Sequence, residues 1–244
     1  MEPLEFTTGQ IRPVECVKEA WALIKDEYWI LWVVSIVGAM IAGISCYVLI
    51  GAMICGILGC YLKKIDGGKA SFEDLWIGFR FFKRSLPVTI LVVFPMVIWI
   101  VVMFITLYLP ILTAAMMGNR RSDDAILGSF AIGLVIDLIV AVVMVCIHSL
   151  LIFCFPLIID RGLSSVDAVK TSARAALKNL GGIGGLMAAT FVIAIAGELA
   201  FCVGLYLIIP LVTAANVVAY RKVFPALATD LRHDPPPPTA YEGL

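Results

Sequence analysis

The chain has 244 residues, 61% of them hydrophobic and 15% charged, and its mean hydropathy of +1.02 lies well outside the range of soluble domains. Its formal net charge of zero gives no reason to expect nucleic acid or an acidic substrate as a partner. The composition therefore excludes an ordinary soluble domain and predicts one helical domain whose solvent is the bilayer.

The N-terminal part of the chain predicts a pair of short membrane spans. The first ten residues are polar or acidic, and the first apolar run begins only at Trp29, so no cleavable signal peptide is expected. Residues 29–62 then hold 34 positions without a charge, which is too long for one spanning helix and suits two of about 17 residues each. We predict spans at 29–44 and 46–62.

A longer pair of spans is predicted in the middle of the chain. The third span, 86–109, is followed by an outer loop at 110–128, and the fourth span, 129–159, is longer than a bilayer requires, an excess that tilt would absorb. Prolines remove backbone donors and should bend or end the third span. They are Pro87, Pro95 and Pro110.

The last apolar block predicts two more spans, at 181–198 and 200–220, which completes a six-span helical bundle over residues 1–224. The tail, 225–244, contains four consecutive prolines and is predicted to be a disordered, solvated cytoplasmic segment. Partner binding by this tail and a frayed terminus are both open interpretations.

The placement of basic residues predicts the orientation of the bundle. Of the 18 Lys and Arg residues, all but Arg120 and Arg121 lie in segments on one side of the six-span arrangement. Cytoplasmic loops carry the Lys and Arg excess, so both termini and two connecting loops are expected in the cytoplasm. The sequence thus predicts a multi-pass membrane protein with both termini in the cytoplasm.

Each pair of spans is preceded by a segment with one shared pattern, which we interpret as a threefold internal repeat. Gapless alignment of 13–28, 71–86 and 165–180 brings apolar residues into coincidence at i, i+4 and i+7, the spacing of one helical face. Two of the segments begin with the S-x-x-[DE] form of a helix start, at Ser71 and Ser164. We predict amphipathic helices at about 13–28, 71–85 and 164–180, lying in the cytoplasmic interface. The alternative is that any multi-pass protein needs polar, helix-starting connectors before its spans.

Several short motifs are spread over most of the chain. They are Gly56, Tyr61, Gly68 and the FEDLWIGF series (72–79), FPLIID (155–160) followed by a helix with Ala168, Ser172 and Asn179, and Gly204, Pro210 and Ala219-Tyr220-Arg221. In these motifs the chain resembles the membrane domain of glycerophosphoryl diester phosphodiesterases and the related stand-alone multi-pass bacterial membrane proteins of unknown function. In that family the hydrolase chemistry belongs to a separate soluble barrel, for which this chain has no room. The resemblance implies a membrane fold and not an enzymatic activity.

Polar side chains at membrane depth are the candidate functional residues, because ionisable groups there are costly. His148 lies 11 residues, or about 16 Å, from the cytoplasmic end of the fourth span, near the midplane, and Asp137 lies 11 residues further out on the same face. A proton or ion path along that face is one hypothesis, and Asn216 near the inner end of the last span is a further polar candidate. The alternative is structural: His148 and Asn216 bond neighbouring helices, and Asp137 and Glu198 meet water at the outer surface.

The sequence predicts no catalytic, metal or cofactor site, since it contains no H-E-x-x-H, G-x-S-x-G or Walker-type loop and no C-x-x-C pair. The glycines of GGIGG (181–185) are expected to serve close helix packing, and most of the seven cysteines to serve packing as well. Cys46 and Cys202 fall near predicted outer turns, where an oxidising compartment could join them.

We therefore expect a non-catalytic membrane scaffold or accessory subunit. The expected partners are membrane lipids, with anionic lipids of the inner leaflet favoured by the basic residues, and a membrane-protein partner or a second copy of the chain. The alternative function is a transporter or channel for a small solute or lipid, with a polar path near His148.

Overall fold

The computed structural model describes residues 6–45, 48–117, 123–199 and 203–226. Within these ranges the chain forms helices and connecting turns and no β-strand, which confirms the predicted all-α class. Five helices in the same ranges are long and apolar enough to cross a membrane, which indicates a membrane protein. They are Pro13–Ile44, Phe72–Leu112, Leu127–Arg161, Leu180–Leu199 and Gly204–Val223.

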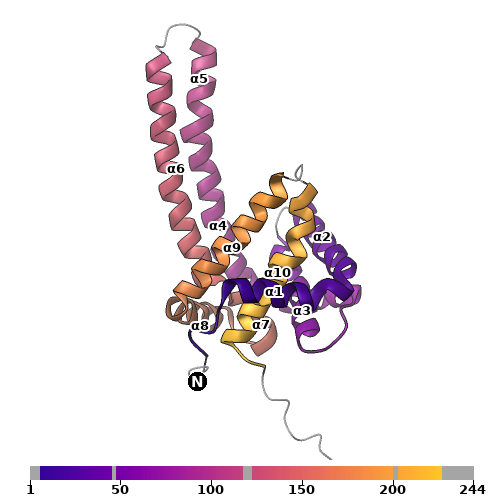
Figure 1. Ribbon diagram of the computed structural model, residues 1–244. Helices are drawn as coiled ribbons and strands as arrows, with labels where there is room; N and C mark the ends of the chain where they lie inside the picture. Colours follow the sequence, from indigo (N-terminus) through magenta and orange to yellow (C-terminus); the bar gives the residue numbers. More distant parts are fainter. Residues whose placement is uncertain (1–5, 46–47, 118–122, 200–202, 227–244) are drawn as a thin grey trace, which may run out of the picture.

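The elements fall into three groups, each with a short helical segment followed by a helical hairpin (Figure 1). The first group is α1 (Pro13–Ile24), η1 (Lys25–Glu27), α2 (Tyr28–Ile44) and α3 (Ile50–Ile65). The second is η2 (Phe72–Phe81), α4 (Phe82–Met103), the π-helical turn η3 (Phe104–Tyr108), α5 (Leu109–Met117), α6 (Asp123–Leu151) and α7 (Cys154–Arg161). The third is α8 (Ser165–Lys178), α9 (Leu180–Leu199) and α10 (Val203–Val223).

The three hairpins differ in length. The helices α2 and α3 have 17 and 16 residues, α9 and α10 have 20 and 21, and the run from α4 to α5 continues from Phe82 to Met117. At about 1.5 Å per residue, α3 is about 24 Å long and the α4–α5 run about 54 Å. The hairpin of α4, α5 and α6, called the long hairpin below, therefore projects well beyond the other two (Figure 1).

Serine caps start two of the short segments, as the S-x-x-[DE] pattern predicts. The Ser71 hydroxyl accepts a hydrogen bond from the Glu73 amide, and the Asp74 carboxylate accepts one from the Ser71 amide at 3.0 Å. The Ser164 hydroxyl accepts from the Asp167 amide at 3.3 Å. Each cap therefore determines the residue at which the short segment begins after the preceding hairpin. The segment after Ser71 is, however, a 3₁₀-helix that continues directly into α4.

The largest differences from the predicted boundaries lie in the second pair of spans. The expected loop at 110–128 is helical up to Met117 and again from Asp123, so the predicted end of the third span at 109 is wrong. The π-helical turn accommodates Pro110: the Leu109 amide bonds the Phe104 carbonyl five residues earlier, so the helix passes this proline without a break. The predicted span 129–159 is instead divided at residues 152–153 into α6 and α7.

Pro210 in α10 shows how side chains of a neighbouring helix compensate for a missing backbone donor. Pro210 has no N–H for the Tyr206 carbonyl four residues earlier. The Trp32 indole N–H of α2 donates to that carbonyl at 2.9 Å, and the Tyr28 hydroxyl, one turn earlier on α2, donates to the Leu207 carbonyl. This pair of bonds joins the first hairpin to the third.

The segment η2 packs on α3 with its backbone in direct contact. A Cβ at Gly78 would lie 2.0 Å from the Ala52 carbonyl oxygen, and one at Gly56 would lie 2.1 Å from the Leu75 carbonyl oxygen. Side chains larger than hydrogen at these two positions would push the segments apart. The glycines therefore allow η2 to lie across α3 at a distance that no other residue permits.

The largest buried side chains gather where α3, α7 and α10 end, which we call the polar end of the bundle. Tyr61, Phe153, Tyr220 and Phe224 are fully buried there or one to two turns from it, and Tyr220 and Phe224 lie in ring contact at 5.2 Å. The Tyr61 hydroxyl lies 3.0 Å from the Ser35 hydroxyl, so its polar atom is satisfied inside the core. This core packs the three hairpins together at the polar end.

Candidate functional site

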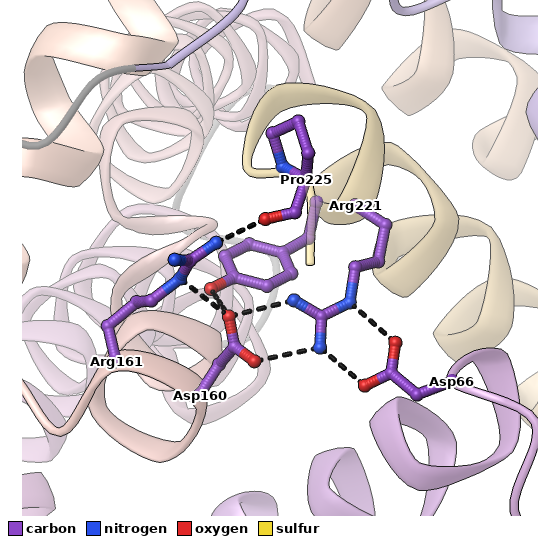
Figure 2. Close-up of polar contacts among 6 residues, drawn as sticks. Asp66, Asp160, Arg161, Arg221 and Pro225 are labelled. Atoms are coloured by element: carbon purple, nitrogen blue, oxygen red, sulfur yellow. Dashed lines mark hydrogen bonds and ion pairs between the residues drawn. The ribbon is translucent and has the colours of Figure 1, made fainter. Parts of the chain in front are cut away.

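The ends of the second helices of all three hairpins meet at the polar end. Asp66 follows the last residue of α3, Asp160 and Arg161 end α7, and Arg221 lies in the last turn of α10 (Figure 2). These residues come from positions up to 155 apart in the chain. Together with Tyr220 they form one contiguous set of polar contacts, called the ion-pair cluster below.

Arg221 is the centre of the ion-pair cluster. Its guanidinium group binds Asp66 through Nε at 3.1 Å and Nη2 at 2.6 Å, and it binds Asp160 through Nη1 at 2.8 Å and Nη2 at 2.7 Å (Figure 2). Both contacts are bidentate, the strongest geometry for an arginine and a carboxylate. A single side chain thus joins the ends of all three hairpins.

The remaining members complete the bonding of Asp160. The Tyr220 hydroxyl donates to Asp160 Oδ2 at 2.7 Å and Arg161 Nε donates to the same oxygen at 2.9 Å. Arg161 also donates to the Pro225 carbonyl. The Arg161, Arg221 and Asp160 side chains are 8%, 11% and 16% exposed, whereas that of Asp66 is 41% exposed.

The ion-pair cluster holds two arginines and two aspartates, so its formal charges cancel. Each charged group is bound by a partner of opposite sign, and the groups point toward one another rather than into a cavity (Figure 2). A buried pair of this kind fixes a geometry, and removal of one partner leaves an uncompensated charge. The arrangement therefore suits a structural clamp between hairpins better than chemistry on a substrate.

Further ion pairs tie the short segments to the hairpin ends. Lys63 binds Asp74 at 2.9 Å, Lys64 binds Glu27 at 2.9 Å, and Lys222 binds Glu19 at 2.8 Å. The hydrogen bonds to Asp74 raise the pKa of the Lys63 ammonium group above its usual value.

The sequence prediction did not include the ion-pair cluster, although a signal for it exists. Asp66 and Asp160 each precede a glycine by two residues, in Asp66-Gly67-Gly68 and Asp160-Arg161-Gly162, and each is followed within five residues by the Ser that caps the next segment. Gly67 and Gly162 have φ values of +86° and +61°, which glycine adopts readily. Alignment of the helix ends, rather than of the amphipathic segments, would have shown the aspartates as a pair.

His148 lies three residues before the end of α6. Its Nδ1 is 2.8 Å from the Met144 carbonyl of the same helix, and its side chain is half-buried. Since α6 ends at Leu151, His148 lies closer to the helix end than an unbroken helix to Ile159 implies. It is not part of the ion-pair cluster.

Asp137 lies at the middle of α6, inside the long hairpin. The Thr106 hydroxyl, in the π-helical turn, donates to Asp137 Oδ2 at 2.9 Å, and Asp137 Oδ1 is buried without a hydrogen-bond partner among the described residues. Gly133, one turn away, lets α6 approach the Thr106 carbonyl. His148 and Asp137 therefore bond different partners, Met144 and Thr106, and the structure brings no direct pair together.

Asn216, the third predicted polar candidate, lines a cavity of about 270 Å³, called the central cavity below. Each of three helical segments contributes residues spaced by three to its wall: Ile54 and Ile57 from α3, Ile152 and Phe155 from the α6–α7 junction, and Thr213 and Asn216 from α10. His148 and Asp137 do not line this cavity. The structure thus separates the three predicted candidates into three different environments.

Ser172 in α8 and Asn179 at the C-terminal end of α8 each form hydrogen bonds with backbone groups of another segment. The Ser172 hydroxyl accepts from the Phe153 amide at 3.1 Å and donates to the Leu150 carbonyl at 2.7 Å, so it satisfies backbone groups at the break between α6 and α7. Asn179 accepts from the Gly9 amide at 2.9 Å and donates to the Thr7 carbonyl at 3.3 Å. Both roles are structural.

Other predicted features remain without a test in this structure. Cys46 and Cys202, the outer residues Arg120 and Arg121, and the tail from residue 227 lie outside the described residues. Among the residues that the structure does describe, no group of three or more His, Cys, Asp or Glu side chains comes together in a way that could hold a metal ion.

No protein-family model, curated protein or solved structure matches the chain. The resemblance to the phosphodiesterase membrane domain therefore stays a prediction from the motifs alone.

Proposed function

We propose that this chain is a non-catalytic, multi-pass protein of a bacterial inner membrane that acts as a scaffold or accessory subunit for another membrane component. The observation that carries the proposal is the long hairpin (Figure 1). In their most apolar stretches, 11% of the residues of Phe72–Leu112 and 6% of those of Leu127–Arg161 are buried, against 44% for Gly204–Val223. An apolar helical pair with so little internal packing offers its faces to lipid or to the helices of a partner.

The proposed architecture has six spans and three interfacial helices in a threefold repeat. Its support is the cyclic packing of the short segments: η2 lies against α3 of the hairpin before it, α8 lies against α6 and α7 of the hairpin before it, and α1 lies against α9 and α10 of the last hairpin. Three unrelated connectors would not be expected to share this packing arrangement. The repeated spacing around the central cavity supports the same architecture.

The proposed orientation places the polar end and both termini in the cytoplasm. The basic residues Lys63, Lys64, Arg161, Arg221 and Lys222 all lie at the ends of second helices, on this side of the bundle. A cytoplasmic position satisfies the positive-inside rule and brings exposed Lys and Arg side chains of the interfacial segments near anionic lipids of the inner leaflet.

The runner-up function is a transporter or channel for a small solute or lipid, and the central cavity beside Asn216 is the observation that favours it. A continuous polar path along α6 is less well supported. His148 bonds its own helix, and Asp137 bonds Thr106 in the π-helical turn η3 of the same hairpin, so neither side chain is directed to the other.

Site-specific photocrosslinking in native membranes tests the scaffold proposal. A photoreactive phenylalanine analogue replaces Phe104, which is 53% exposed on the long hairpin, and the matched control replaces Val192, which is 64% exposed on α9. Both positions face the surroundings of the bundle, so lipid contact alone gives the same result at each. We expect a discrete protein adduct from position 104 and none from position 192, with mass spectrometry identifying the adduct.

Adducts with lipid alone at both positions would count against a protein partner on the long hairpin. Orientation is tested separately by a tag at the C-terminus, which we expect to be digested by protease only in inside-out vesicles.

A further inference from the structure

The central cavity lies between the second helices of the three hairpins and has an unusual lining. Its wall is apolar except for Thr213 and Asn216, both on α10, and no charged residue lines it. The Asn216 side chain is partly accessible, and it has no hydrogen-bond partner among the residues that the structure describes. Its amide is therefore available to bond a molecule that enters the cavity.

The central cavity adjoins the lipid-facing side of the bundle. A groove of about 740 Å³ runs between α9 and α10, lined mainly by apolar residues such as Phe191, Ile209 and Val212. Thr213 lines both this groove and the central cavity. Molecules dissolved in the bilayer can therefore reach the neighbourhood of Asn216 from the side.

The ion-pair cluster follows the central cavity along α10. Arg221 lies five residues beyond Asn216 on this helix, or about 7.5 Å along it. There its bonds to Asp66 and Asp160 hold the ends of α3, α7 and α10 together. The cluster thus joins the helical segments that also contribute residues to the cavity wall.

We infer that the central cavity and the groove form one binding site for a membrane-dissolved molecule with a hydrocarbon chain and a neutral hydroxyl head. The hydrocarbon chain of this molecule lies in the groove between α9 and α10, and its hydroxyl head bonds Asn216 beside Thr213. A hydroxyl both donates and accepts, as the asparagine amide requires. An anionic head is excluded, because the central cavity has no charged lining residue and the charged lining residue of the groove, Glu198, is acidic. A scaffold needs no such site, so this inference goes beyond the proposed function.

Photolabelling of the purified full-length chain in nanodiscs tests the site. The probes are hexadecanol and palmitic acid, each carrying a diazirine and an alkyne, and labelled peptides are located by mass spectrometry. We expect hexadecanol to label the peptides around residues 152–156 and 213–216 above the level found on the long hairpin, and palmitate to label them no more than that hairpin. Asn216→Leu should lower the hexadecanol labelling about tenfold, the effect of one hydrogen bond lost in an apolar site.

The matched control is Thr171→Val on α8, since Thr171 lines neither the groove nor the central cavity. This variant should label like the wild type. Equal hexadecanol labelling of the wild type and Asn216→Leu overturns the inference. Equal labelling of the site by hexadecanol and palmitate also overturns it, as does hexadecanol labelling of the site no higher than that of the long hairpin. Loss of a crosslinked partner at position 104 would leave these results unchanged, so the two proposals fail separately.

Discussion

The hydrogen bond from Trp32 to Tyr206 gives a prediction in which the structure fixes both the size and the context of the effect. Trp32→Phe keeps an aromatic ring on α2 but removes the indole N–H that lies 2.9 Å from the Tyr206 carbonyl oxygen. Pro210 has no amide hydrogen to replace it. The carbonyl therefore loses its partner in an apolar region.

The expected loss of stability is about 0.6–1.7 kcal/mol, the average and the maximum measured for hydrogen bonds between helices inside membranes. Pro210→Ala returns the amide hydrogen to α10, so Trp32→Phe in that background should cost about 1 kcal/mol less. The coupling between the two substitutions is the quantity that the structure predicts.

The four proteins of this double-mutant cycle are the wild type, Trp32→Phe, Pro210→Ala and the double variant. Their free energies of unfolding are measured by reversible unfolding in mixed micelles with increasing SDS, followed by circular dichroism. Trp29→Phe is the control, because Trp29 is 67% exposed and its indole makes no hydrogen bond with any described residue. It should change stability by less than about 0.5 kcal/mol. Equal effects of Trp32→Phe with and without Pro210 would refute the compensation of the proline by α2.

Three further substitutions test other parts of the fold. Arg221→Met should destabilise the protein by about 3–5 kcal/mol, because two aspartates lose their shared partner, and the same unfolding assay measures this loss. Ser172→Ala should cost about 1–3 kcal/mol by leaving the Phe153 amide unbonded, whereas Thr171→Ala, next to it, should be nearly neutral in thermal unfolding. Gly78→Ala should reduce the folded yield on size-exclusion chromatography, because its Cβ would meet the Ala52 carbonyl at 2.0 Å, while Gly59→Ala, with open space around it, should keep or increase stability by up to about 1 kcal/mol.

The helical class and the approximate positions of the apolar segments follow from the sequence because both depend on local properties. Long uncharged runs specify helices in a bilayer, and the serine caps at Ser71 and Ser164 specify where two segments start. These features need no knowledge of distant residues. The boundary errors lie where backbone geometry depends on tertiary context, as at Pro110, whose π-helical turn packs against Gly133 of α6.

The candidate site was harder to predict for the same physical reason. His148 and Asp137 stand out in a sequence because they are polar within apolar runs, yet each bonds a nearby backbone or hydroxyl group. Arg221 looks in the sequence like an ordinary basic helix end. Its contacts with Asp66 and Asp160 join residues 155 and 61 positions away, and only the folded chain brings them together.

The N-terminal segment completes the cyclic order of the bundle without a covalent link. A covalent connector leads from α3 to η2 and another from α7 to α8, whereas the described residues after α10, up to 226, form no further helix. In its place the Thr7 amide donates to the Val223 carbonyl at 2.9 Å, and the Thr7 hydroxyl donates to the Lys222 carbonyl. These are unpaired carbonyls of the last helical turn, which any helix end must satisfy. Residues 6–12 therefore lead from the end of α10 into α1, just as the covalent connectors lead from α3 into η2 and from α7 into α8. As a result, α1 packs on the last hairpin in the way that η2 and α8 pack on the hairpins before them.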